Sequence, residues 1–305
     1  MGLKSGDIIL NRYEIILLLG EGCAKVFLVE DIKNNLKTYA LKVIHKKEFR
    51  KHTNLRRHLD NEVRIQLSLP IHPNIIRLYR QMEDMNYYYL LMEFVTPGEL
   101  YDLLYPNISS DDTESSEDTE EGFPEPEAKN YFLQMVQALK CLREYGIIHR
   151  DIKLQNMLLN ENGILKLCDF GCATDKKPKN IVGTTKYTSP EMNDYNVEYY
   201  NYKTDIWSLG ICLFEMIYTE KPFNGKNDKV IEKKILKGRF TFPEKPTISP
   251  ELKDLIKKLL TRNPRMRIGY QDIENHPWCR PNFSYYPKTQ ENTQEKTQEN
   301  TQFEY

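Results

Sequence analysis

The segment HRDIKLQN at residues 149–156, followed by the triplet DFG that begins at Asp169, decides how this chain of 305 residues folds. Asp151, Lys153 and Asn156 place a carboxylate, a cation and an amide within six positions, and Asp169 comes eighteen residues after Asp151. Each of these residues alone is compatible with a structural role. The ordered set is instead typical of a site that carries chemistry.

The residues between these two motifs read as a hairpin of two short strands, MLL at 157–159 and LKL at 165–167. Such a hairpin predicts that Asn156 and Asp169 lie close together. Phosphoryl transfer needs oxygen ligands for Mg²⁺, a cation near the phosphates and a carboxylate that orients the attacking hydroxyl. The two motifs together therefore predict a phosphoryl-transfer site.

The first third of the chain reads as a small antiparallel sheet with one helix. Its strand-like runs occupy residues 13–19, 25–29, 37–43, 75–78 and 87–94. The predicted helix, residues 55–69, spaces its apolar positions four apart, at Leu55, Leu59, Val63 and Leu67. The glycines of Gly20-Glu21-Gly22 lie between two strands and not between a strand and a helix, which excludes a dinucleotide-binding fingerprint.

After Gly98 the sequence becomes predominantly helical. Helices are predicted at residues 128–145, 204–218 and 252–260. We therefore expect an α+β fold of two lobes that meet near residues 93–98. The expected divisions are an N-terminal extension (1–12), a β-rich N-lobe (13–95) and a helical C-lobe (96–279).

Two polar segments interrupt this pattern. The stretch 106–126 is rich in Asp, Glu, Ser and Thr and is expected to be a mobile acidic insert of the C-lobe. The tail 280–305 contains a Thr-Gln-Glu repeat and is expected to be disordered. Nine acidic residues lie between Asp111 and Glu127, and without them the net charge would change from −1 to +8.

Composition excludes several classes of protein. With 40% hydrophobic and 29% charged residues, the chain has the balance of a globular protein, and no run of eighteen apolar residues suggests a membrane span. The six cysteines form no Cys-x-x-Cys pair, so neither a zinc site nor a disulfide framework is expected. We expect an intracellular protein, in the cytoplasm or nucleus, and the charge gives no reason to propose a nucleic-acid partner.

With these motifs in place, the chain from about Tyr13 to Trp278 resembles a eukaryotic serine/threonine protein kinase, a bilobal fold. The resemblance implies ATP and Mg²⁺ as cofactors. Lys42, paired with Glu62, would hold the α- and β-phosphates. The other residues implied to contact the nucleotide are Leu19, Gly20, Glu21, Gly22, Cys23, Val26, Ala40, the gatekeeper Met92, the backbone of Glu93 and Val95, Glu99 and Leu158.

The same resemblance assigns the chemical roles. Asp151 would accept or orient the substrate hydroxyl proton, Lys153 would neutralise the γ-phosphate, and Asn156 and Asp169 would hold Mg²⁺. Thr184 would contact Asp151. Lys153 two residues after Asp151, together with Gly183-Thr184, resembles the serine/threonine branch.

Two departures from the family pattern affect these expectations. The glycine-rich loop is one residue short between Gly22 and Val26 and lacks its third glycine, which leaves a pseudokinase scaffold as an alternative. Asn180 stands where the family has an activating threonine, and an amide cannot acquire the charge of about −2 that a phosphate would present to Arg150. We therefore predict activity without phosphorylation there, aided by a partner on the N-lobe.

Within the kinases, the chain resembles the Aurora family. The stretches that carry this likeness are NEVRIQ (61–66), HPNIIRLY (72–79), RFTFP (239–243) and ENHPW (274–278). The resemblance implies a monomeric catalytic subunit with a role in mitosis at spindle or chromosomes. Calcium/calmodulin-type and Polo-like kinases remain alternatives, although the short chain after the kinase segment disfavours the Polo-like kinases. Glu99 and Glu215 match positions that read basic residues upstream of the target hydroxyl, which predicts protein substrates of basic context.

Overall fold

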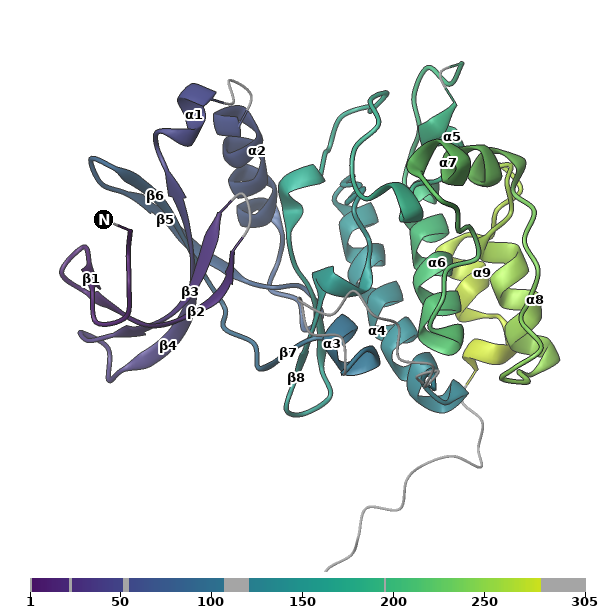
Figure 1. Cartoon of the computed structure of the whole chain (residues 1–305), viewed down its shortest axis with the longest axis horizontal. Coiled ribbons are helices and arrows are strands. Elements are labelled where there is room, and N and C mark those ends of the chain that lie inside the picture. The colour runs from purple at the N-terminus through teal and green to yellow at the C-terminus, as the bar shows by residue number, and fades with distance from the viewer. Residues whose placement is uncertain (1, 22–23, 52–54, 107–120, 195, 281–305) are drawn as a thin grey trace, which may run out of the picture.

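The computed structural model describes residues 2–21, 24–51, 55–106, 121–194 and 196–280. These residues form two lobes, a sheet with one main helix and a larger helical body (Figure 1). The fold class predicted from sequence is therefore confirmed. The repeat tail and most of the acidic insert lie outside the described residues.

The N-lobe is built on an antiparallel sheet of six strands in the order β1-β2-β3-β4-β6-β5. Its strands are β1 (Ile8–Ile9), β2 (Tyr13–Glu21), β3 (Lys25–Asp31), β4 (Lys37–His45), β5 (Leu78–Glu83) and β6 (Tyr87–Met92). On β3, Phe27 and Val29 are buried while their neighbours are partly exposed, the alternation of a strand with one buried face. β1 pairs with β2, so part of the expected N-terminal extension belongs to this sheet.

Two helices follow β4 in the chain, α1 (Glu48–Lys51) and α2 (Leu55–Ser68). Leu59 and Val63 of α2 are buried against the sheet, as predicted. Leu67, predicted on the same stripe, is 54% exposed, and Ile65 is fully buried in its place. A spacing of four residues turns about 40° further than a full helical turn, so a stripe with that spacing drifts away from the buried face.

The C-lobe packs its helices around α6 (Lys203–Tyr218), which is buried over almost its whole length. Gly210 permits this packing, because a Cβ there would lie 2.8 Å from the Cβ of Leu259. The other helices are α3 (Leu100–Leu104), α4 (Glu125–Glu144), α5 (Pro190–Asn193), α7 (Asp228–Lys237), α8 (Pro250–Leu259) and α9 (Tyr270–Glu274). A small sheet of β7 (Pro97–Glu99), β8 (Met157–Asn160) and β9 (Leu165–Leu167) contains the predicted hairpin.

Some expected boundaries were wrong. Residues 75–77 form no strand of the main sheet: Ile75 instead bridges to Leu167, and Ile76 N donates to Leu167 O at 2.9 Å. The helix expected at 128–145 starts three residues earlier, since α4 begins at Glu125. The carboxylate of Glu125 accepts hydrogen bonds from Ser249 N, Ser249 Oγ and Trp278 Nε1 at 2.6, 2.7 and 2.9 Å.

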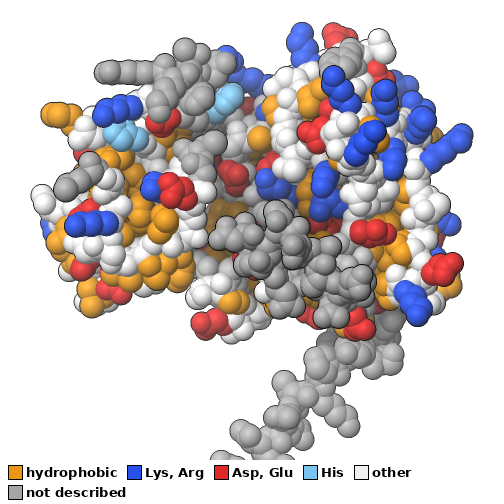
Figure 2. Space-filling view, viewed as in Figure 1, with side chains coloured by type: hydrophobic (Ala, Val, Ile, Leu, Met, Phe, Trp, Pro, Cys, Tyr) orange, Lys and Arg blue, Asp and Glu red, His pale blue; other side chains and the backbone are white. Residues whose placement is uncertain are grey.

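Figure 2 shows lysine and arginine side chains gathered along the C-lobe edge where Figure 1 places α7. Lys229, Lys233 and Lys237 of this helix are exposed. None of the helices in the described ranges is long and apolar enough to span a bilayer.

Candidate active site

Lys42 lies in the middle of β4 and reaches α2 across the N-lobe. Its Nζ donates to Oε1 of Glu62 at 2.8 Å, and the two side chains are only 19% and 6% exposed. Burial opposes the charge of Lys42, but the nearby Glu62 and Asp169 carboxylates outweigh it and raise the pKa of the ammonium. The lysine is therefore a permanent buried cation, which suits a group that binds phosphates.

Asp169 connects this N-lobe pair to the C-lobe. Its Oδ1 lies 3.7 Å from Lys42 Nζ, and its side chain is 49% exposed. The backbone of Asp169 is left-handed, with φ of 58°, a costly conformation for a residue with a Cβ. Such strain is often kept at functional sites, where it aims a particular side chain.

Asp151 is the most heavily hydrogen-bonded carboxylate of the predicted set. Its Oδ1 accepts from both N and Oγ1 of Thr184 at 2.9 Å, and Lys153 Nζ lies 2.9 Å from Oδ2. Burial acts to raise the pKa of Asp151, but the bonds from Lys153 and Thr184 outweigh it and hold the pKa below its usual range. Asp151 is thus ionised at neutral pH and can accept a hydrogen bond from a hydroxyl.

Asn156 lies beside Asp151 and close to Asp169. Its Nδ2 donates to Asp151 O at 2.8 Å and to Asp151 Oδ2 at 3.2 Å, which turns Oδ1 of the amide toward other ligands. Its backbone oxygen accepts from Cys168 N at 2.9 Å, so Asn156 and Asp169 are neighbours, as the hairpin predicted.

The donor set suits Mg²⁺ held with a nucleotide. Within the described ranges no cluster of three His, Cys, Asp or Glu residues could hold a metal by itself. One amide oxygen and one carboxylate match the way in which Mg²⁺ is bound through few protein ligands, with phosphate and water oxygens completing the octahedron.

The backbone of the HRD segment (149–156) is held in place by hydrogen bonds to α6. Asp205 accepts from His149 N and Arg150 N at 2.8 Å each. These bonds hold Arg150 in a left-handed conformation, with φ of 70°. The side chain of Arg150 is thereby directed at the activation segment, 172–188.

Three uncharged oxygens surround the Arg150 guanidinium. They are Cys172 O at 2.6 Å, Asn180 Oδ1 at 3.2 Å and Tyr200 Oη at 3.4 Å. Tyr200 Oη also donates to Asn180 O at 2.7 Å. The amide at 180 therefore offers Arg150 a neutral acceptor, without the charge that a phosphate would bring.

Gly183 lets the activation segment approach the HRD segment. Its φ is 86°, and a Cβ there would lie 2.3 Å from Arg150 O. Only glycine is compatible with both conditions. The next residue, Thr184, can therefore reach Asp151.

The residues expected around the nucleotide are brought together by strand pairing. Gly20 faces Val26, Val26 faces Lys42, and Ala40 faces Met92 in the main sheet. Leu158 faces Glu99 in the small sheet. Leu19 and Glu21 lie on β2 beside Gly20, whereas Gly22 and Cys23 lie outside the described residues.

At the hinge, Glu93 N donates to Arg77 O at 2.8 Å. Only the carbonyl of Glu93 is therefore left to meet an adenine edge, next to the backbone of Val95. The side chain of Glu93 pairs with Lys166 at 3.0 Å.

The expected basic-residue reader at Glu215 was wrong in one respect: this carboxylate is not open to a ligand. It is fully buried and pairs with Lys221 of the same chain. Glu99 differs, because it is partly exposed and no ion pair to it is formed within the described ranges. Burial, followed by the nearby charge of Asp102, raises the pKa of Glu99.

Sequence reasoning missed the contacts that join α2 to the activation segment. Asn61 Nδ2 donates to Ala173 O at 2.9 Å, and Arg64 forms a forked pair with Asp175 at 2.7 and 2.9 Å. No local signal marks pairs separated by more than a hundred residues. In the C-lobe, Arg267 donates to the buried Glu191 carboxylate through two bonds of 2.6 and 2.9 Å.

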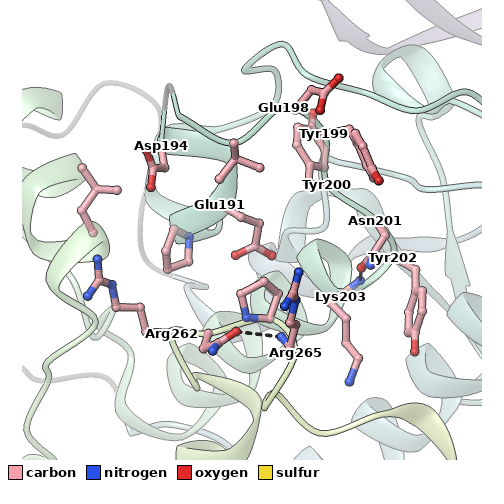
Figure 3. A pocket seen from close by; sticks show the side chains of 15 residues that line it. Glu191, Asp194, Glu198, Tyr199, Tyr200, Asn201, Tyr202, Lys203, Arg262 and Arg265 are labelled. Carbon is pink, nitrogen blue, oxygen red and sulfur yellow. Dashed lines mark hydrogen bonds between the residues drawn. The ribbon is translucent and has the colours of Figure 1, made fainter.

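A groove of about 830 Å³ opens on the C-lobe, away from these residues. Figure 3 shows the side chains that line it, among them Tyr200, Tyr202, Lys203, Arg262 and Arg265. Its lining residues begin at Pro190, just after the activation segment in the chain, and none of the predicted nucleotide residues lines it.

Comparison with known proteins agrees with this geometry. The protein kinase domain family matches residues 13–279. The chain belongs to the protein kinase family. An Aurora kinase of Candida glabrata is 36% identical over 278 residues, which cover 90% of this chain and 72% of the relative.

Other kinases are similar to a comparable degree. Calcium-dependent protein kinase 4 of Plasmodium berghei is 33% identical over 291 residues, covering 92% of this chain, and the chain spans about half the length of that relative, 52%. The cAMP-dependent protein kinase type 3 of Saccharomyces cerevisiae is 33% identical over 286 residues, covering 90% of this chain and 66% of the relative.

Proposed function

We propose that this kinase transfers the γ-phosphate of ATP to serine or threonine hydroxyls of proteins. The observation that carries the proposal is the ionised Asp151 carboxylate, fixed by Thr184 and Lys153 at 2.9 Å and adjacent to Asn156. A carboxylate fixed in this way can orient one hydroxyl for attack.

Each part of the site has a separate task in this mechanism. Lys42, kept charged by Glu62, binds the α- and β-phosphates, and Lys153 offsets charge on the γ-phosphate. Asn156 and Asp169 hold Mg²⁺, which, when bound, neutralises the phosphate oxygens and orients them. Leu19, Gly20, Glu21, Val26, Ala40 and Leu158 enclose the nucleotide and exclude water.

The test is transfer of ³²P from Mg·ATP to a serine/threonine peptide library by wild type and Asp151→Asn, both treated with phosphatase first. Loss of a positioned base costs about 10²–10⁴-fold in rate. Asp272→Asn, on the distant helix α9, is the matched control and should retain wild-type activity. Transfer equal in wild type and Asp151→Asn would overturn the assignment, and absence of transfer from both would favour a scaffold.

We infer further that the kinase has an Aurora-like role in cell division, at spindle or chromosomes. The support is the likeness to Aurora kinases at 34–36% identity over at least 90% of this chain. Depletion from dividing cells should produce chromosome missegregation that the wild-type gene corrects and Asp151→Asn does not. Correction by the inactive variant would contradict a catalytic role in division.

Basic-context selection is assigned to Glu99 alone. This carboxylate is partly exposed at the start of α3, where Lys153 of the catalytic segment is close enough to affect its pKa. Glu99→Gln should remove selection for an upstream arginine in the library. Asp102→Asn, on the same helix, should leave that selection intact.

A further inference from the structure

Glu215 is a buried charge in the last turn of α6. Its side chain has no exposed surface, yet Oε2 accepts from Tyr187 Oη at 2.6 Å and Oε1 accepts from Tyr105 Oη at 3.3 Å. Taking a carboxylate out of water costs several kcal/mol unless a cation accompanies it. The cation here is Lys221, whose Nζ bonds to Oε1.

Lys221 comes from the loop after α6 and folds back over this carboxylate. Its side chain is 15% exposed, and its ammonium lies 5.1 Å from the centre of the Tyr187 ring. The lysine is therefore fixed by an ion pair and by an aromatic face. A second cation could not reach Glu215 without displacing it.

This pair lies next to the residues that would receive a peptide. Tyr187 follows Thr184 by three residues, and Thr184 contacts Asp151 directly. Cys212, one turn before Glu215 on α6, contacts Ile152 O at 3.9 Å, next to Asp151 in the chain. Glu215 is thus an acidic group close to the HRD segment. Its counter-charge comes from Lys221 of the same chain.

We propose that Lys221 is a specificity-determining residue: it occupies the acidic subsite at Glu215 and prevents that subsite from selecting a basic side chain of the substrate. The proposal rests on the proposed kinase function. It predicts that wild type shows no selection that depends on Glu215. Removal of the lysine charge exposes an unpaired carboxylate, which then recruits an arginine from the peptide.

The experiment is the positional peptide library with wild type, Lys221→Met, Lys221→Arg and the double variant Lys221→Met/Glu215→Gln. Lys221→Met should gain selection for arginine at one upstream position by about tenfold or more, the size of a charge-assisted pair. Lys221→Arg should keep the wild-type profile. The double variant should lose the gain, because the carboxylate is absent.

Lys221→Met leaves a buried carboxylate without its cation and can fail to fold, so a thermal melt accompanies each variant. If Lys221→Met does not fold, the library profile of the single variant Glu215→Gln tests the proposal. An unchanged library profile supports the proposal, and a loss of arginine selection at any position overturns it. A folded Lys221→Met enzyme with the wild-type profile also overturns it. Absence of transfer by wild type would instead count against the kinase function, which keeps the two failures distinguishable.

Discussion

Single hydrogen bonds set the state of Asp151, the carboxylate on which the proposed chemistry depends. Burial favours its neutral form, whereas Lys153 and Thr184 favour its ionised form and prevail. A carboxylate whose folded pKa is depressed contributes stability above its unfolded pKa, and this contribution is lost as the pH falls through the folded value. The same bonds therefore affect both stability and activity at acidic pH.

Thr184→Ala should move the acidic limb of the pH profile of kcat/KM to higher pH. The variant loses the hydroxyl that donates to Asp151 Oδ1 at 2.9 Å, and loss of a donor to the charged form raises a carboxylate pKa. Thr184→Ser retains the donor and should keep the wild-type limb. An acidic limb at the same pH in all three proteins would contradict the role given to this bond.

The hydroxyl of Tyr200 is also expected to affect activity. Its Oη accepts from Arg150 and donates to Asn180 O, so it connects the HRD segment to the activation segment. Tyr200→Phe should lower kcat/KM several-fold, in line with about 1 kcal/mol for a hydrogen bond. Tyr199→Phe is the matched control, because Tyr199 is 51% exposed. Equal activity of the two variants would contradict the assignment.

At the scale of elements, strands and helices could be predicted from sequence, but the contacts between them could not. Strand-like composition predicted the strands 13–19 and 37–43, and apolar residues spaced four apart predicted the helix 55–69, almost to their observed bounds. The HRD and DFG motifs likewise gave Asp151 and Asp169. Lys221 was missed because a surface-loop lysine has no pattern that reveals which buried carboxylate it meets.

The forked pair of Arg64 and Asp175 joins α2 to the activation segment, and Arg64 lowers the pKa of Asp175 by hydrogen bonding to it. Arg64→Gln should cost less than about 1 kcal/mol of stability, since exposed pairs contribute little. Activity should fall more, because α2 also carries Glu62. The swapped double variant Arg64→Asp/Asp175→Arg should recover part of kcat. If the swapped double variant has a kcat no higher than Arg64→Asp or Asp175→Arg alone, the result would argue against a role for this ion pair.

Glu125 connects three elements of the C-lobe: α4, which it begins, the start of α8 at Ser249, and the turn of Trp278. Glu125→Ala should lower the free energy of unfolding by about 2–3 kcal/mol, because three donors lose a charged acceptor. Glu121→Ala, an exposed member of the same acidic block, should leave the melting temperature unchanged. Equal melting temperatures would show that the block contributes nothing to the fold.

At the scale of the whole molecule, the two lobes meet through the groups that would bind the nucleotide. Lys42 and Glu62 belong to the N-lobe and Asp169 to the C-lobe, and Lys42 Nζ lies within 4 Å of both carboxylates, at 2.8 and 3.7 Å. Arg64 and Asp175 add a second connection between the lobes. A ligand that binds this cluster therefore stabilises the lobes together, and its binding is measurable as resistance to unfolding.

Mg·ATP should raise the melting temperature by several degrees, since a ligand at about 100 times its Kd stabilises by about 2.7 kcal/mol. Lys42→Met should abolish the shift, whereas Lys47→Met, an exposed lysine after the same strand, should preserve it. Asp169→Asn should remove the part of the shift that requires Mg²⁺, because the aspartate is one of the two proposed ligands. A shift of equal size in Lys42→Met and wild type would place the nucleotide elsewhere, and no shift in wild type would identify a kinase fold that does not bind ATP.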